Sequence, residues 1–594
     1  MYGSLAYCLA LHPALERLQH EFPDVRVLAY CDDVTLLGPP QRAAAAYRRW
    51  SALYAIHMQG SLRDDKGHAF SPTIDERGAR AAGIPLSMSF SSEGVKILGS
   101  PVGSAAYTAQ FLSDSIDESI QLMHVLARAP LLQAQLVILS KSILPRLIYL
   151  QRTIPTGDLY NPEAMHGRRL DAATRELVAS LMPHTTLTDR AWSIACQPGA
   201  RGGLGLQTFS ETADAAYLAS YMLARHELPK LFPDLTTAFS DPTARPTPTH
   251  PTPQSAAAWR AHDRLAQTHP GITELMPPPD NERPSVHHLQ KRISALAAET
   301  RSARIYADLP DNRSKAQYLS HCTDPYTFSA LPTGPDLTIS NKLMPLCIAR
   351  RLLLPITSCS CEVHQCVVCN SPTADLLGDH SLLCISDANP RRTTLWHDAS
   401  YRVWARLLKS VGYSVTQEAH NALLSDSMKR PDLLIHDHSA SGPNTFIDFI
   451  TCVVSKSTNV AQGASLPGAA ADNGANEKNS DWLDLVQAQD DTFVAIAQED
   501  GGALNPAALD LLESAVRRAG GTKGEKAAMR TYWRQRIAVA NARGVAGVIR
   551  ARTPICTGAH WPLQPHHFSH LPDLCPIARL PRAGAENLIE PETG

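Results

Sequence analysis

Three groups of residues in this sequence have types and spacings that could do chemistry, and the first is the adjacent pair Asp32 and Asp33. Apolar, partly β-branched runs flank the pair over residues 27–30 and 34–37, which predicts a tight β-hairpin with the aspartates at or beside its turn. Such strands favour burial, whereas carboxylates resist it unless a positive partner meets them. Mg²⁺ or Mn²⁺ would suit their hard oxygen atoms. The alternative is a purely structural turn, because aspartate is common in turns.

The second group consists of three cysteines and one histidine at metal-ligand spacing: Cys366, Cys369, His380 and Cys384. Two closely spaced pairs each close a small chelate loop, and soft thiolates with one imidazole favour tetrahedral Zn²⁺. Four protein ligands leave no position for water, so the predicted role of the metal is structural. Cys359 or Cys361 could replace one ligand. The alternative is a set of reduced, buried cysteines beside an unrelated histidine.

The third group is a second pair of aspartates, Asp432 and Asp448, each next to or inside an apolar, strand-like run. A polar turn over 438–443 joins the two runs, so antiparallel pairing would bring the two carboxylates together. Such a pair can hold a metal that activates water and stabilises charge on a phosphate under attack. The alternative is again structural, because Pro-Asp is a frequent turn dipeptide.

The first aspartate pair resembles a known active site. Tyr30-Cys31-Asp32-Asp33 between apolar strands resembles the active-site hairpin of reverse transcriptases, in particular those of non-LTR retrotransposons. Residues 4–15 resemble the end of the substrate-positioning helix that precedes the hairpin in that family. Lys66 falls where the family places a lysine, and residues 98–103 resemble its primer-grip turn.

The other two groups resemble the endonuclease half of the same retrotransposons. The cysteine–histidine group is similar in type and position to the zinc knuckle that precedes their restriction-enzyme-like endonuclease. Arg430-Pro431-Asp432-Leu433 with the later Asp448 resembles the PD-(D/E)xK nuclease pattern of that domain. The resemblance runs from residue 4 to about residue 550.

The sequence departs from the family pattern in two places. The upstream aspartate-bearing strand and the Gln-Gly-Asp-Pro-like helix start are missing, which predicts an N-terminally truncated chain without polymerase activity of its own. The nuclease pattern also places a lysine where this sequence has Ile450. Lys456 or Lys478 could deliver the charge, and we favour Lys478. It follows a small, polar stretch over 471–476 that is predicted to be a loop, although the family has a helix there. The alternative is an ordinary solvated lysine.

These patterns predict an α+β, multidomain chain. The parts, in order, are a partial reverse-transcriptase palm over 1–104, a helical thumb and connector over 105–232, a Pro/Thr-rich linker over 233–284, a helical connector over 285–355, the zinc knuckle over 356–390, a PD-(D/E)xK-like α/β endonuclease domain over 391–552 and a tail over 553–594. Helices are predicted over 396–411, 509–516 and 529–549, where apolar residues recur at helical spacing.

Composition limits the function classes. The formal net charge of the 594 residues is −2, so any phosphate-binding surface must be local rather than a property of the whole chain. The thirteen cysteines are an odd number in a long chain and do not resemble a secreted disulfide framework. No signal peptide opens the sequence and no apolar run reaches membrane-spanning length, which predicts an intracellular protein without a membrane partner.

The resemblance implies a fragment of a retrotransposon-encoded reverse transcriptase/endonuclease in the nucleus, with the element transcript (RNA) and target DNA as partners. It implies Asp32, Asp33, Asp432, Asp448 and Lys478 as catalytic residues, with Mg²⁺ or Mn²⁺ at both acid pairs and Zn²⁺ at the knuckle. Two other interpretations remain: a non-catalytic, zinc-dependent nucleic-acid-binding protein, or a degraded open reading frame without a selected function.

Overall fold

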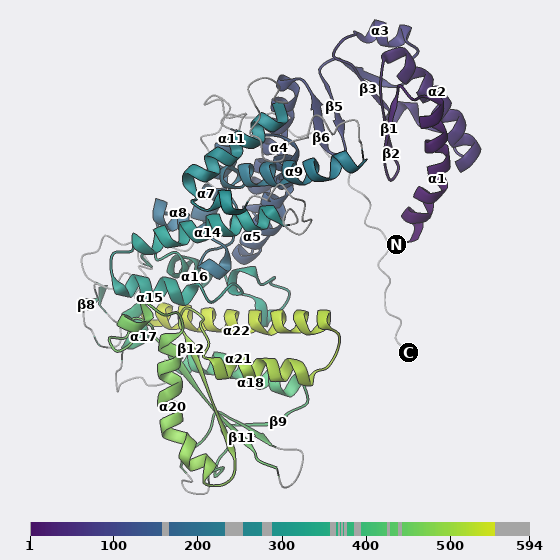
Figure 1. Cartoon of the computed structure of the whole chain (residues 1–594). Coiled ribbons are helices and arrows are strands. Elements are labelled where there is room, and N and C mark those ends of the chain that lie inside the picture. Colours follow the sequence, from purple (N-terminus) through teal and green to yellow (C-terminus); the bar gives the residue numbers. More distant parts are fainter. Residues whose placement is uncertain are drawn as a thin grey trace, which may run out of the picture. The chain divides into compact units, whose positions relative to one another are not determined.

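A computed structural model (Figure 1) describes residues 2–156, 166–183, 185–231, 253–275, 288–356, 364–365, 369, 372–373, 377–384, 394–423, 428–436 and 442–552. The protein is a mixture of helices and small sheets, which agrees with the predicted α+β class. Residues 1–555 form one compact unit, so the domain boundaries drawn inside it stay predictions. Among the described helices, none has the length and apolar character to cross a lipid bilayer.

The N-terminal aspartates lie on a two-stranded hairpin, as predicted. Strands β1 (Arg26–Tyr30) and β2 (Asp33–Leu37) are antiparallel, with Tyr30 opposite Asp33. Cys31 has a φ of 54°, which allows the two-residue turn through Asp32. The hairpin packs through Val27, Val34 and Leu36 against helices α1 (Tyr2–Glu21) and α2 (Pro40–Met58).

A second hairpin occupies the predicted turn at 98–103. Strands β5 (Gly94–Ile97) and β6 (Ser100–Gly103) are joined by Leu98 and Gly99, which have φ values of 48° and 83°. Two successive positive φ values are typical of the tight turns that match strand twist. The neighbouring elements are the 3₁₀ turn η1 (Asp64–Lys66), strands β3 (His68–Phe70) and β4 (Ser89–Ser91), and helix α3 (Glu76–Ala81).

The middle of the chain is helical, as its apolar spacing predicts. Its helices are α4 (Ala105–Leu126), α5 (Leu132–Ile138), α6 (Ile148–Thr153), α7 (His166–Ser180), α8 (Asp189–Ala195), α9 (Phe209–Leu231), α14 (Leu289–Ala307), α15 (Asn312–His321) and α16 (Met344–Arg351). Between α5 and α6 the chain stays helical through a π turn and a 3₁₀ turn, η3 (Leu144–Leu147), which accommodates Pro145. One large hydrophobic core joins most of these helices.

The predicted linker over 233–284 is corrected by the structure where it is described. Residues 253–275 form helices α11 (Pro253–Thr268) and α12 (Ile272–Leu275), which share a core with α9 and α14. Ala257, Ala258, Ala261 and Leu265 repeat at helical spacing and are buried. Proline content misled the prediction, because Pro253 stands at the start of α11, where a missing N–H costs nothing.

The C-terminal part is built on a four-stranded sheet in the order β12-β11-β10-β9. Its strands are β9 (Ser414–Gln417), β10 (Leu433–His436), β11 (Thr445–Cys452) and β12 (Thr492–Glu499). Strands β9, β10 and β11 pair antiparallel, and β11 pairs parallel with β12. Helix α20 (Ala469–Gln487) covers one face, and α18 (Thr394–Ser410), α21 (Pro506–Arg518) and α22 (Lys523–Arg552) pack on the other (Figure 1). The short helix α19 (Val460–Gly463) contacts α15.

The predicted loop over 471–476 is wrong, because these residues lie inside α20. Their small side chains serve packing rather than flexibility. Ala470 and Ala471 are fully buried against the sheet, and a Cβ added to Gly474 would lie 2.4 Å from Cys452 Sγ. Close approach of the helix to β11 therefore requires the small residues that look like a loop in the sequence.

Two adjacent arginines at the end of α16 are buried rather than arranged on a surface. Arg350 Nη1 donates to Asp379 Oδ1 over 2.9 Å, and its Nη2 donates to Asp500 at the end of β12. Arg313 and Gln317 also donate to Asp379, each over 2.6 Å. This ion network joins the helical connector, helix α17 (Asp379–Leu383) and the C-terminal sheet.

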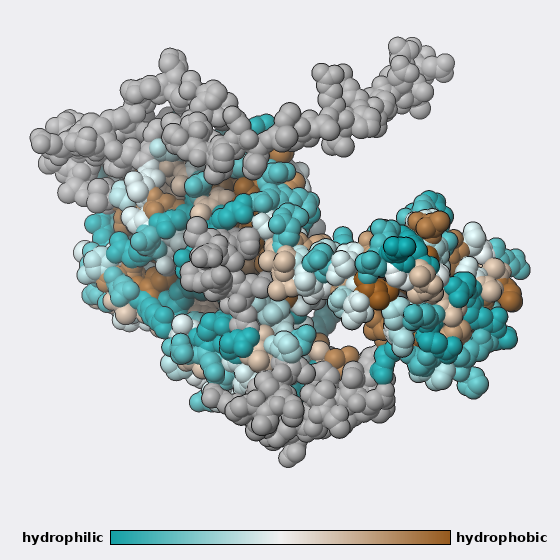
Figure 2. Space-filling model, turned by 90° about the horizontal axis from the view of Figure 1, so that it is seen from above, coloured by the Kyte–Doolittle hydropathy of each residue, from teal (hydrophilic) through white to brown (hydrophobic). Residues whose placement is uncertain are grey.

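The surface mixes hydrophilic and hydrophobic side chains. On the face drawn in Figure 2, hydrophilic residues lie among smaller hydrophobic patches. Single exposed apolar residues such as Leu86 and Met428, each 85% exposed, are normal on a protein surface. The near-zero net charge is therefore accompanied, on this face, by a surface that mixes hydrophilic and hydrophobic residues.

We predict that Arg350→Met destabilises the protein by about 3–5 kcal/mol, because it leaves Asp379 and Asp500 buried without their shared cation. Chemical denaturation followed by circular dichroism measures the change. The control is Arg146→Met, whose partner Glu118 is exposed, with an expected loss below about 1 kcal/mol. Equal losses in the two variants would contradict the prediction.

Candidate functional site

Asp432 and Asp448 are neighbours across two strands. The pairing of Leu433 with Ile447 places Asp432, one residue before β10, opposite Asp448 in β11. Side chains alternate along a strand. Since Ile447 belongs to the core under α18, Asp448 points to the other face, toward α20. The antiparallel pairing predicted from the sequence is therefore observed.

Helix α20 supplies two donors to Asp448. Lys478 Nζ lies 2.6 Å from Asp448 Oδ2, and Trp482 Nε1 donates to the same oxygen over 3.1 Å. The two donors are four residues apart and thus share one helix face. Ile450, at the position where the nuclease pattern expects lysine, packs against Gly474 of α20 instead. Lys456 is exposed beyond the end of β11.

Asp432 is held from the opposite side of the sheet. Its Oδ2 accepts the backbone N–H of Phe449 over 2.7 Å and lies 3.2 Å from His397 Nε2 of α18. The same His397 nitrogen is 3.0 Å from the carbonyl oxygen of Phe449. A carbonyl oxygen only accepts, so we assign the ring proton of His397 to Nε2.

The electrostatics of the acid pair depend on these contacts. Burial, and then the negative charge of Asp432, raise the pKa of Asp448 to about 6, although Lys478 opposes the shift. Burial lowers the pKa of Lys478 and that of His397, but their acidic partners outweigh it, so both pKa values are raised. The arrangement is an acid pair with the ammonium of Lys478 at one carboxylate and the imidazole of His397 at the other.

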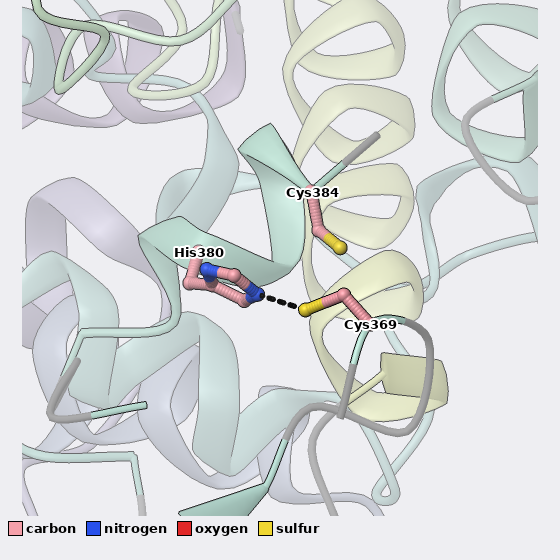
Figure 3. A group of neighbouring side chains, drawn as sticks. All are labelled: Cys369, His380 and Cys384. Carbon is pink, nitrogen blue, oxygen red and sulfur yellow. Dashed lines mark hydrogen bonds between the residues drawn. The ribbon is translucent and has the colours of Figure 1, made fainter. Parts of the chain in front are cut away.

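A cysteine–histidine cluster lies in the region predicted as a knuckle. Cys369, His380 and Cys384 have ligand atoms within 4.8 Å of one another, and Cys369 Sγ is 3.3 Å from His380 Nε2 (Figure 3). Tetrahedral zinc with such ligands implies ligand–ligand distances of about 3.5 Å, so the three residues fit this metal. The fourth predicted ligand, Cys366, lies outside the described residues.

The cluster is anchored in the protein interior. Cys384 is 6% exposed, and the preceding helix α17 begins at Asp379, which is fully buried. Arg552 at the end of α22 donates to the carbonyl oxygens of Ser381 and Cys384 over 2.9 and 2.8 Å. Strands β7 (His364–Gln365) and β8 (Pro372–Thr373) form a small hairpin in the same segment. These contacts favour a structural metal.

The N-terminal aspartates have a different environment. Asp32 and Asp33 are exposed at the end of their hairpin. They belong to no group of three potential ligands within the part of the chain that the structure describes. The sequence also contains a Cys/His-rich group over 556–575, which lies outside the described residues.

Three residues at or near the C-terminal site were missed by sequence reasoning. His397 and Glu499 give no local signal, because their partners come from distant segments. Trp482 stands four residues after Lys478, and this spacing was a usable clue. Glu499 ends β12 and accepts from the backbone N–H groups of Ala470 and Ala471 at the start of α20.

Comparisons with known proteins give one distant relative. The chain is 25% identical over 229 residues to the "Retrotransposable element SLACS 132 kDa protein" of Trypanosoma brucei gambiense. The match covers 36% of this chain and 17% of that protein, so this chain corresponds to a small part of the relative's length. No protein-family model matches the sequence. The similarity supports a retroelement-related origin.

We predict that Glu499→Gln makes the protein relatively more stable as the pH rises from about 4.5 to 7. Burial is the main cause that raises the pKa of Glu499 from 4.5 to about 7. In this window the folded state holds a proton that the unfolded state releases, so wild-type stability falls with rising pH. Above pH 7 the variant's advantage should reach the order of 3 kcal/mol. Denaturation curves across pH measure it, and a pH-independent difference would contradict the prediction.

We predict that Cys384→Ser removes bound zinc and lowers the melting temperature. Zinc should be lost because Cys384 is one of the ligands of the cluster. The melting temperature should fall because the metal then no longer stabilises the segment that Arg552 contacts. Atomic absorption and thermal denaturation measure the two effects. Cys347→Ala is the control, because Cys347 is a buried cysteine outside the cluster that donates to the carbonyl oxygen of Ala542. This variant should keep its zinc. Normal zinc content in Cys384→Ser would exclude the cluster.

Proposed function

We propose that this chain is a retroelement-derived, metal-dependent DNA endonuclease with Asp432, Asp448 and Lys478 as its catalytic residues. The observation that carries the proposal is the cross-strand pairing of the two aspartates with Lys478 Nζ 2.6 Å from Asp448. Two carboxylates and a lysine are the components of the PD-(D/E)xK pattern, and here the lysine comes from α20 instead of position 450. The similarity to a retrotransposable-element protein supports the same assignment.

The two carboxylates have the chemistry for a divalent ion. Mg²⁺ or Mn²⁺ held there would activate water and stabilise charge on the phosphodiester. Each aspartate has its Oδ2 occupied by donors, so the other oxygen, Oδ1, is the one that can be offered to an ion. Lys478, whose ammonium stands on a flexible stem, would then turn from Asp448 toward the phosphate.

The remaining parts are proposed in the light of this function. The hairpin with Asp32 and Asp33 belongs to a reverse-transcriptase palm. The cysteine–histidine cluster is a structural Zn²⁺ site. Target DNA is the substrate, the element RNA is a further partner, and the nucleus is the place of action.

A second candidate is a nucleic-acid-binding protein with an idle acid site. One observation favours it: Lys478 is closed onto Asp448, and Ile450 stands where the pattern expects lysine. In this case the ammonium of Lys478 would neutralise Asp448 in place of a metal ion. Binding of DNA without cleavage in Mg²⁺ or Mn²⁺ would identify this case.

We predict that the full chain nicks supercoiled plasmid in Mn²⁺, and that Asp432→Asn and Asp448→Asn each reduce the rate by about 100-fold or more. Gel analysis of the nicked form measures the rate. Asp33→Asn is the matched control, because it removes one acid from the exposed hairpin and should cleave like wild type. Equal rates in wild type and Asp448→Asn would refute the assignment.

A further inference from the structure

Trp482 is a buried residue whose polar atom is directed at a carboxylate. Its side chain is 3% exposed, and its indole N–H donates to Asp448 Oδ2 over 3.1 Å. A buried indole needs an acceptor, and a backbone carbonyl would satisfy it equally well. The acceptor here is instead one of the two acids at the candidate nuclease site.

The plane of the indole is fixed on several sides. Phe493 of β12 stacks on it with ring centroids 5.8 Å apart and planes 7° apart. Phe446 of β11 lies against it at 6.5 Å, and Lys429 Nζ is 5.1 Å from the ring centroid. Lys429 also donates to the carbonyl oxygen of Asp481, which ties this lysine to α20. The N–H therefore has one direction, toward Asp448.

Two donors with different properties meet one oxygen of Asp448. Lys478 brings a charge on a flexible stem, whereas Trp482 brings a neutral donor on a rigid ring. If Lys478 turns toward a phosphate, the indole N–H is the donor that keeps Oδ2 in place. Rotation of the carboxylate is then restricted, and Oδ1 keeps its direction.

We propose that Trp482 is a positioning residue for a divalent ion: its indole N–H holds Asp448 Oδ2 so that Oδ1 is presented to the ion beside Asp432. The inference rests on the proposed function and deepens it. Donors that orient metal ligands change metal affinity by about 10- to 100-fold when they are removed. Because the indole is neutral, its removal changes orientation without changing the charge of the site.

Trp482→Phe in the full, zinc-loaded chain tests the proposal, because phenylalanine keeps an aromatic ring against Phe493 and loses the donor together with part of the ring volume. We expect the Kd for Mn²⁺, measured by calorimetry on the folded variant, to rise about 10- to 100-fold. Nicking at saturating Mn²⁺ should recover toward the wild-type rate, since the loss lies in metal affinity. Trp50→Phe makes the same change at a buried tryptophan of α2 and should leave the Kd for Mn²⁺ unchanged.

Asp448→Asn in the same titration separates the two proposals. If Asp448→Asn loses Mn²⁺ binding while Trp482→Phe binds as tightly as wild type, the role of Trp482 is overturned and the metal site stands. If Asp448→Asn binds Mn²⁺ as wild type does, both proposals fall.

A second measurement applies if Trp482→Phe does not fold. The wild-type chain has eight tryptophans, and ¹⁵N-labelled indoles give a signal for each. Addition of Mg²⁺ should shift one indole signal, and Asp448→Asn should abolish the shift. A wild-type spectrum in which Mg²⁺ moves no indole signal would overturn the proposal.

Discussion

A carboxylate can be buried in a sheet only where donors replace the water it loses, and this constraint organises the C-terminal part of the protein. Asp448 is met by Lys478 and Trp482 from the middle of α20. Glu499 is met by the first backbone N–H groups of the same helix. The helix that delivers the lysine is therefore held in register by two acids on neighbouring strands. Its small residues allow the close approach that these contacts need.

The strands and the acid pair could be predicted because their signals are local. Alternation along 445–452 and the polar turn before it were enough to pair Asp432 with Asp448. Helix α20, which carries Lys478, could not be predicted from the local sequence. The stretch Ala-Asp-Asn-Gly-Ala-Asn is typical of a loop unless a sheet packs against it. His397 reaches Asp432 from a separate helix, and no sequence spacing records that contact. Tertiary packing, which the local sequence pattern does not contain, determines both the helical state of α20 and the contact of His397 with Asp432.

The burial of the basic residues also could not be predicted from the local sequence. Arg350 and Arg351 are adjacent basic residues in a chain with almost no net charge, a pattern that is more often a solvated face than a phosphate-binding groove. In the structure both are buried, and Arg350 joins Asp379 beside the metal cluster to Asp500 at the end of β12. The cluster is thus tied to the acid-bearing sheet through one guanidinium. A metal held by this cluster would therefore stabilise the contact between α17 and the C-terminal sheet.

The two aspartate pairs differ because one is adjacent in sequence and the other across strands. Asp32 lies in the turn and Asp33 begins β2, so both stand at the exposed end of the hairpin and need an acid from another strand to complete a pocket. Asp432 and Asp448 need no third strand, since the antiparallel register alone places them opposite each other on neighbouring strands. Burial raises the pKa of Asp448 there, whereas the hairpin acids are exposed to water. Proposed metal chemistry in this chain therefore rests on the C-terminal pair.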